Sequence, residues 1–118
     1  MFIYLNINLN KNHIAYAIIY NSIGLNYYYQ MDYEKSIIYY NKAIHVLESI
    51  NTEHYYISIT NKNIAQVYTE LNDYVNAEKY YKILGEKIET VKNTLKPEEY
   101  LQLKDGVKGR LDYLKKMK

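Results

Sequence analysis

The sequence lacks several residue types, and each absence excludes a class of structure. It has no cysteine, which excludes a disulfide framework and a thiolate metal site. It has no Asn-x-Ser/Thr triplet, which favours an intracellular protein, and we expect a cytoplasmic one. The net charge is only +2, so composition does not indicate nucleic acid or an anionic membrane as a partner. The longest apolar run, Ile14 to Tyr20, falls far short of the roughly 18 residues of a membrane span. These features together predict a soluble protein.

Tyrosine is the residue that the sequence has in excess. There are 17 tyrosines against one phenylalanine and no tryptophan, so tyrosine must supply most of the aromatic packing. The chain has 118 residues, of which 48% are hydrophobic, and this is enough to bury the core of a single domain. A core rich in tyrosine has to direct its hydroxyl groups to water or to polar partners.

A long segment of the chain occurs twice. Asp32-Tyr33 reappears as Asp73-Tyr74, Tyr39-Tyr40 as Tyr80-Tyr81, and Gly24 has its counterpart in Ala65. Each pair is separated by 41 residues. A fixed period in this range is typical of supersecondary units that stack on one another.

Apolar residues recur at helical spacing, which predicts an all-α fold of five antiparallel helices joined by short turns. We expect Asp32 and Asp73 to cap the second and fourth helices, and Pro97 to begin the fifth. A polar break is expected at Ser49 to Glu53. The predicted single domain, 1–118, consists of a stub of a preceding repeat (1–10), a first repeat (11–50), a second repeat (51–94) and a capping helix (97–118).

The repeated residues resemble those of the tetratricopeptide repeat. The resemblance rests on Tyr20-x2-Ile23-Gly24-x2-Tyr27, followed by Ser36-x3-Tyr40-x2-Ala43, and it covers residues 11–94. It implies an α-solenoid made of helix-turn-helix units. Several features depart from the family pattern. Met31 and Asn72 stand where glycine is usual, Asn61 replaces a large residue, and the proline that closes the unit is absent. The period also exceeds the basic one of about 34 residues.

No pattern in the sequence indicates catalysis. There is no glycine-rich phosphate loop, no nucleophile elbow and no His-x3-His pair. His13 and His54 are 41 residues apart, so they occupy equivalent places in adjacent units, which favours two polar positions over a shared metal site. We therefore expect no enzyme activity, no cofactor and no metal.

The resemblance implies a concave binding groove lined by the first helix of each unit. In this sequence the positions are Asn21, Leu25, Tyr28, Tyr29, Lys62, Asn63, Gln66 and Glu70. Carboxamides both donate and accept hydrogen bonds, so they suit the backbone of an extended peptide, and tyrosine offers a flat apolar surface with a polar tip. The alternative interpretation is that these residues are merely solvated positions of an asparagine-rich protein.

The sequence therefore predicts a scaffold module that binds a protein or peptide. Two alternatives stay open: the sensor part of a bacterial peptide-responsive transcriptional regulator, and a structural module that associates with itself. The apolar residues within 1–9 predict that the N-terminal end pairs with a second copy in a homodimer or docks on the rest of a larger protein. The basic cluster near the C-terminus is either a solvated face or a site for an acidic partner. Its members are Lys104, Lys108, Arg110, Lys115, Lys116 and Lys118.

Overall fold

The computed structural model describes residues 14–50 and 55–117 of the chain. These residues form five α-helices, with a short 3-10 turn before the last, and contain no strand, so the predicted all-α fold of antiparallel helices is confirmed. The N-terminal stub at 1–10 and the predicted dimer contact at 1–9 lie outside the described residues. The chain separates into two compact units, residues 1–52 and 53–118, which are described separately below.

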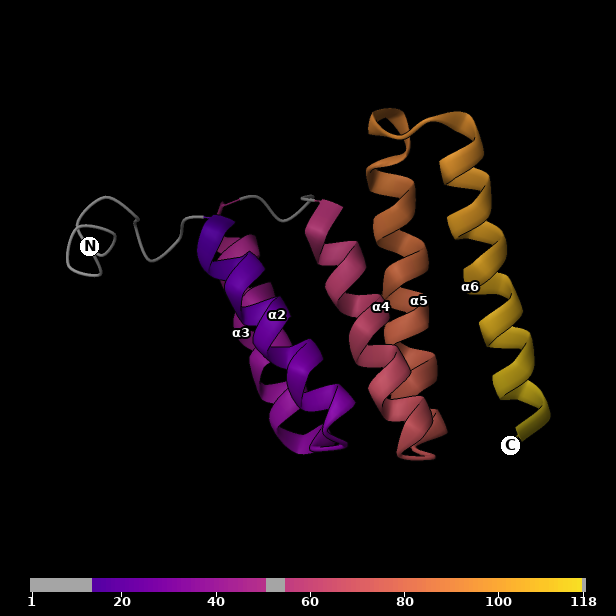
Figure 1. The fold of residues 1–118 in the computed structure, drawn as a ribbon. Helices are drawn as coiled ribbons and strands as arrows, with labels where there is room; N and C mark the ends of the chain where they lie inside the picture. Colours follow the sequence, from indigo (N-terminus) through magenta and orange to yellow (C-terminus); the bar gives the residue numbers. More distant parts are fainter. Residues whose placement is uncertain (1–13, 51–54, 118) are drawn as a thin grey trace. The chain divides into compact units, whose positions relative to one another are not determined.

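Unit 1 is a hairpin of two antiparallel helices, α2 (Ile14–Tyr29) and α3 (Tyr33–Ile50) (Figure 1). The sequence predicts a break that begins at Ser49, but α3 continues through Ser49 and Ile50. The prediction was wrong at these two residues because a polar side chain does not by itself end a helix. The Ser49 hydroxyl donates to the carbonyl oxygen of Val46 at 2.6 Å, so it is satisfied within the last turn.

The two helices of unit 1 approach each other closely at Gly24. A Cβ atom at this position would lie 2.7 Å from Cδ1 of Tyr40, whose ring is only 1% exposed. The Ser36 hydroxyl crosses from α3 and donates to the carbonyl oxygen of Gly24 at 2.8 Å. Burial raises the pKa of Tyr40 from 10.0 to about 12, and the nearby Ser36 hydroxyl opposes this shift. The missing side chain at Gly24 therefore lets α2 and α3 approach closely.

Stacked tyrosines line each hairpin at equivalent positions. In unit 1, Tyr27 stacks on Tyr39 with ring centroids 5.6 Å apart. In unit 2, Tyr68 and Tyr80 stack at the same separation, 5.6 Å. Lysines lie over these rings: Lys42 is 4.9 Å from the centroid of Tyr39. These tyrosines are half-exposed, and they cover part of their ring faces with each other and with the lysine side chains.

The turn inside each hairpin has the same backbone geometry. Met31 and Asn72 are the only non-glycine residues with positive φ in the described chain, at 63° and 59°. In unit 1 the amide of Asp32 donates to Tyr27 O at 2.9 Å, and that of Met31 to Tyr28 O at 3.0 Å. These are the two bonds of the Schellman motif, and unit 2 repeats them. The positions where the family usually has glycine are therefore the left-handed positions.

The aspartate after each left-handed residue caps the next helix, as predicted. The Asp32 side chain accepts from the backbone N–H of Lys35 at 3.3 Å, and Asp73 accepts from that of Asn76 at 3.2 Å. Each aspartate therefore ends one helix through its backbone and begins the next through its carboxylate.

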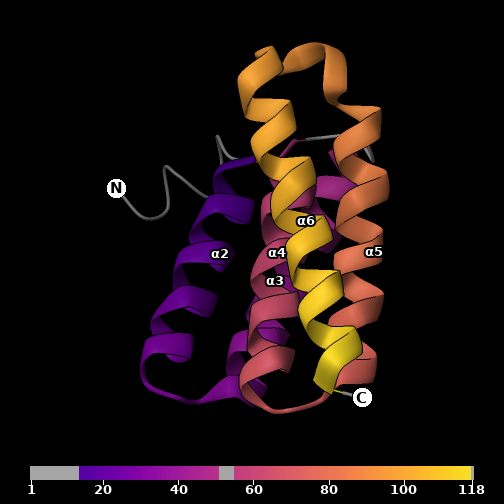
Figure 2. The ribbon, with the colours of Figure 1, turned by 90° about the vertical axis from the view of Figure 1, so that its right-hand side faces the viewer.

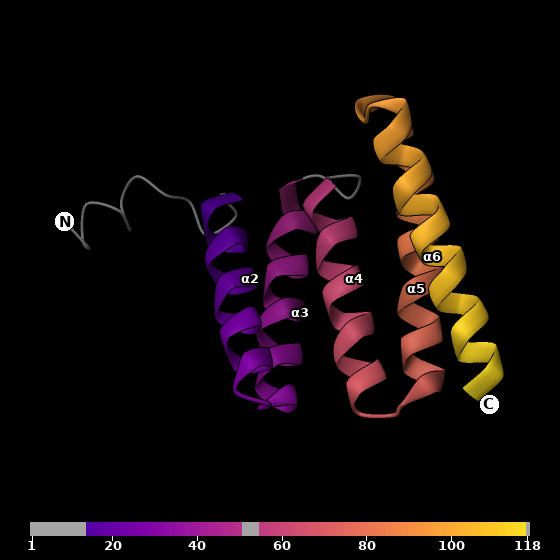
Figure 3. The same ribbon diagram turned by 45° about the vertical axis from the view of Figure 1, so that its right-hand side comes forward.

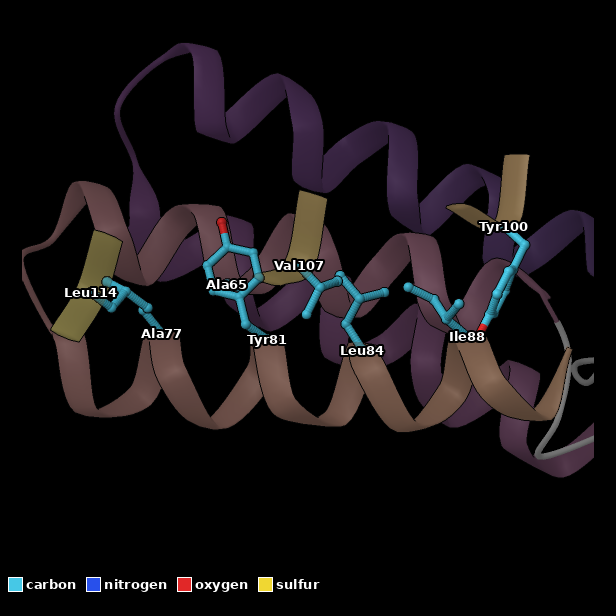
Figure 4. Packing of buried hydrophobic residues seen from close by; sticks show 8 residues of the cluster. All are labelled: Ala65, Ala77, Tyr81, Leu84, Ile88, Tyr100, Val107 and Leu114. Atoms are coloured by element: carbon cyan, nitrogen blue, oxygen red, sulfur yellow. The ribbon is translucent and has the colours of Figure 1, made fainter. Parts of the chain in front are cut away.

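Unit 2 contains three helices. They are α4 (Tyr55–Glu70), α5 (Tyr74–Thr90) and α6 (Pro97–Met117), and the 3-10 turn η1 (Lys92–Thr94) joins the last two. Within this unit α4 and α5 form the antiparallel hairpin, and α6 runs back along α5 (Figures 2 and 3). A buried cluster, drawn in Figure 4, joins the three helices: Ala65, Ala77, Tyr81, Leu84, Ile88, Tyr100, Val107 and Leu114.

The start of α6 is fixed by two features of its sequence. Pro97 occupies the first helical position, where no backbone N–H is needed. The Glu99 carboxylate reaches back and accepts from the backbone N–H of Lys96 at 3.2 Å, which is half of a capping box.

The contact at Gly24 gives a first testable prediction. Gly24→Ala should lower the free energy of unfolding by about 1–3 kcal/mol, because the new methyl group overlaps the Tyr40 ring and the Ser36 backbone. Gly109→Ala is the matched control, since nothing lies within 4 Å of a Cβ there. It should raise stability by about 0.5–1 kcal/mol through helix propensity alone. Urea unfolding measures both changes, and a neutral Gly24→Ala would contradict the close approach.

The left-handed turns give a second prediction. Met31→Gly should stabilise the protein by about 0.5–1 kcal/mol, because glycine adopts positive φ without the steric cost that methionine bears. Asn72→Gly should change stability less, since asparagine tolerates this conformation and the Asn72 side chain accepts a hydrogen bond from the Tyr74 hydroxyl at 2.9 Å. Thermal melts of the two variants compare the sites directly. A larger gain at Asn72 would show that the strain lies elsewhere.

Candidate functional site

The predicted binding residues of unit 1 lie on α2, and we call them the α2 face. They are Asn21, Leu25, Tyr28 and Tyr29. Leu25 is 40% exposed and Tyr29 is 72% exposed, which is high for large apolar side chains. The rings of Tyr28 and Tyr29 meet edge to face at 5.6 Å, and Tyr33 approaches Tyr28 at 5.8 Å. The α2 face therefore ends in a group of three tyrosines.

The predicted binding residues of unit 2 lie on α4, and we call them the α4 face. They are Lys62, Asn63, Gln66 and Glu70. Lys62 and Glu70 are exposed, whereas Asn63 and Gln66 are half-buried. Among the described residues, no hydrogen bond engages the amides of Asn63 and Gln66. These two side chains thus keep both donors and acceptors available to a ligand.

A pocket of about 150 Å³ lies beside the α4 face, within unit 2, and we call it the α6 pocket. One of its residues comes from α4, two from α5 and five from α6: Lys62, Tyr81, Leu84, Gln102, Leu103, Gly106, Val107 and Arg110. The α6 residues follow a spacing of three or four, so they share one side of that helix. A second opening next to it is bordered by Lys62, Glu99, Gln102 and Leu103. Of the predicted binding residues, the α6 pocket includes Lys62 alone.

Charge and apolar surface are separated within the α6 pocket. Leu84, Leu103 and Val107 provide an apolar lining, while Lys62 and Arg110 are exposed cations. Within the described part of the chain, neither cation forms a salt bridge. The side chains that border this pocket therefore carry positive charge that the described residues leave unpaired.

Tyr81 lines the α6 pocket, and its hydroxyl is unusual because it is buried without a hydrogen-bond partner among the described residues. The residue is 2% exposed, and its hydroxyl has no hydrogen-bond partner within the described chain. Tyr81 and Ala65 belong to the same buried cluster, and Figure 4 shows the Tyr81 hydroxyl directed away from α5. Burial raises the pKa of Tyr81, while the Arg110 charge and the Thr69 hydroxyl oppose the rise. Both groups are thus close to the phenol, but neither satisfies it.

The sequence prediction missed the residues that α5 and α6 contribute to this pocket. It named Arg110 only as one member of a basic cluster, either a solvated face or a site for an acidic partner, and it did not single out Gln102 or Tyr81. One signal was available: the 41-residue period pairs Ser36 with Ala77. The tyrosine of the second repeat therefore lacks the serine hydroxyl that lies near Tyr40. The placement of α6 against α5 depends on long-range packing and could not be obtained from the period.

Paired antiparallel helices that recur with equivalent turns, caps and tyrosine stacks define an all-α helical-repeat module. A family model for the tetratricopeptide repeat matches residues 15–82 of the chain. The chain therefore belongs to the tetratricopeptide repeat family, whose modules generally serve protein interaction. A search of curated proteins found no match.

Two further observations concern the described residues only. None of their helices combines the length and the hydrophobicity that crossing a membrane requires. They also contain no group of three or more histidine or carboxylate side chains placed to hold a metal ion. The predictions of a cytoplasmic location and of a homodimer stay predictions.

The unpartnered hydroxyl of Tyr81 gives a third testable prediction. Tyr81→Phe should raise the free energy of unfolding by about 1 kcal/mol, because it removes a buried polar group that has no partner. Tyr40→Phe is the matched control at the equivalent position of unit 1. It should change stability by less than about 0.5 kcal/mol, because the Tyr40 hydroxyl is not among the buried polar atoms that lack a partner and the buried ring is kept. A loss of stability in Tyr81→Phe, measured by urea unfolding, would mean that the Tyr81 hydroxyl is satisfied.

Proposed function

We propose that this chain is a non-catalytic scaffold that binds a segment of another protein, or a peptide, through the α2 and α4 faces. The family provides the general class, since tetratricopeptide modules serve protein interaction. The main observation behind the proposal is the burial and the hydrogen bonding of the Asn63 and Gln66 side chains. These carboxamides are half-buried and engage no hydrogen bond among the described residues. Half-buried amides are stabilised when a ligand supplies donors and acceptors, as a peptide backbone does.

The α2 face supports the same function with a different chemistry. Tyr29 is 72% exposed and contacts Tyr28 in an edge-to-face pair. Tyrosine binds partners well because a large rigid ring buries much apolar area at low entropic cost, and its hydroxyl can still form a hydrogen bond. Exposed Leu25, one turn before Tyr29, adds aliphatic surface to this contact.

The fourth prediction tests this function with a library of random 12-residue peptides displayed on phage and selected on the full chain. Peptides that are enriched should lose at least about tenfold in affinity for Asn21→Ala/Asn63→Ala, because two amide contacts disappear. The melting temperature should change little. Isothermal titration calorimetry measures the affinities, and circular dichroism follows the melting.

Matched controls are available on other parts of the chain. Asn41 on α3 and Asn93 in η1 are exposed and belong to neither face, so Asn41→Ala/Asn93→Ala should bind the selected peptides with unchanged affinity. A marked drop in melting temperature for Asn21→Ala/Asn63→Ala would show that these amides are structural. The proposal fails if no peptide is enriched, or if the selected peptides bind this variant as well as the native chain.

A further inference from the structure

We propose that the α6 pocket is a subsite for one acidic side chain, aspartate or glutamate, of the bound segment. The inference rests on the proposed function and adds to it the chemistry of one anchoring position. It concerns unit 2 alone, because all eight lining residues come from α4, α5 and α6.

The size of the pocket indicates a single side chain. Its volume is about 150 Å³, well below the roughly 300–1,000 Å³ of pockets that hold a whole small molecule. The adjoining opening, bordered by Lys62, Glu99, Gln102 and Leu103, provides room for the chain to continue beyond the pocket. A side chain of a passing segment fits this arrangement better than a chain end.

The charges around the pocket indicate that the side chain is acidic. Lys62 on α4 and Arg110 on α6 are both exposed and, within the described residues, free of salt bridges. A carboxylate between them would gain two charge-assisted contacts, and Arg110 could bind it through two parallel N–H groups. Glu99 borders only the adjoining opening, and its carboxylate accepts from the backbone N–H of Lys96 at 3.2 Å.

The Tyr81 hydroxyl is a second, independent observation that indicates a ligand with an acceptor. Tyr81 is 98% buried (2% exposed), its hydroxyl has no partner, and its side chain lines the pocket. An O–H group that donates to a carboxylate forms a short, strong hydrogen bond. The methylene groups of the same acidic side chain would contact the apolar lining of Leu84, Leu103 and Val107.

Gly106 borders the pocket without a side chain. This residue lines the pocket, and nothing lies within 4 Å of a Cβ built on it. Gly106→Leu would place a side chain in the open space without displacing a neighbour. Gly109 is equally open but does not border the pocket, so Gly109→Leu provides a matched control.

The fifth prediction uses the full chain labelled with nitrogen-15 and three N-acetylated hexapeptides. Hexaglutamate and hexaglutamine both carry a C-terminal amide, and a second form of hexaglutamine has a free C-terminal carboxylate. Acetyl-hexaglutamate amide should shift the side-chain N–H signal of Arg110 in a saturable way, and acetyl-hexaglutamine amide should not. Lys62→Gln and Arg110→Gln should each weaken binding at least about fivefold. Lys108→Gln, which removes the same charge from α6 at a residue outside the pocket, should weaken it less than about twofold.

Three more variants separate this pocket from general attraction to a basic surface. Tyr81→Phe should weaken hexaglutamate binding about fivefold without loss of stability, because only the hydroxyl is removed. Gly106→Leu should abolish binding, and Gly109→Leu should leave it unchanged. Glu99→Gln should strengthen binding about twofold by removing a nearby like charge.

The subsite is overturned if hexaglutamate does not bind, or if Lys108→Gln weakens binding as much as Arg110→Gln does. It is also overturned if acetyl-hexaglutamine with a free C-terminal carboxylate binds more tightly than hexaglutamate amide, since the pocket would then prefer a chain end. These results leave the proposed function intact as long as phage-selected peptides still bind the α2 and α4 faces. Failure of the phage selection itself would instead remove the proposed function.

Discussion

The close contact between a small residue on one helix and a tyrosine ring on the next is the constraint on which each hairpin depends. At Gly24 the Tyr40 ring occupies the space of a Cβ atom, and Ser36 adds a buried hydrogen bond across the two helices. Short interhelix distance lets the side chains on both flanks meet, so the Tyr27–Tyr39 stack follows from it. In unit 2 the equivalent position holds Ala65, which belongs to the same buried cluster as Tyr81 (Figure 4).

The second repeat has the same helix-turn-helix arrangement, but its buried tyrosine hydroxyl lacks a hydrogen-bond partner within the described residues. Ala77 takes the place of Ser36, and the hydroxyl near Tyr81 comes from Thr69 instead, yet the Tyr81 hydroxyl is left without a hydrogen-bond partner in the described chain. Burying a hydroxyl without a partner costs free energy. The apolar area that the cluster of α4, α5 and α6 removes from water offsets this cost. Buried polar groups without a partner are rare in native proteins, so each one calls for a physical explanation. Tyr81 is therefore a position at which the two repeats differ in hydrogen bonding.

The parts of the fold that depend on neighbouring residues could be predicted from the sequence. Asp32, Asp73 and Pro97 act within one turn of their own position, so their roles as caps and helix start followed from local chemistry. The α3 end at Ile50 was misjudged because a polar residue such as Ser49 can satisfy its hydroxyl within the last turn and does not by itself end a helix. The α6 pocket could not be predicted from the sequence, because Arg110 and Tyr81 come from different helices and only the folded structure shows that both line the same pocket. Lys62 was found because the repeat pattern fixes its face of α4.

The paired tyrosine stacks have a consequence for optical spectroscopy. Without tryptophan, the near-ultraviolet signals of the protein come from its 17 tyrosines and single phenylalanine. Tyr27–Tyr39 and Tyr68–Tyr80 hold their rings at the same centroid distance and at interplanar angles of 22° and 21°. Near-ultraviolet circular dichroism therefore reports fixed packing in both hairpins without any added label. Because the two pairs are nearly alike in geometry, their bands overlap, and only the replacement of one tyrosine resolves which hairpin has lost its order.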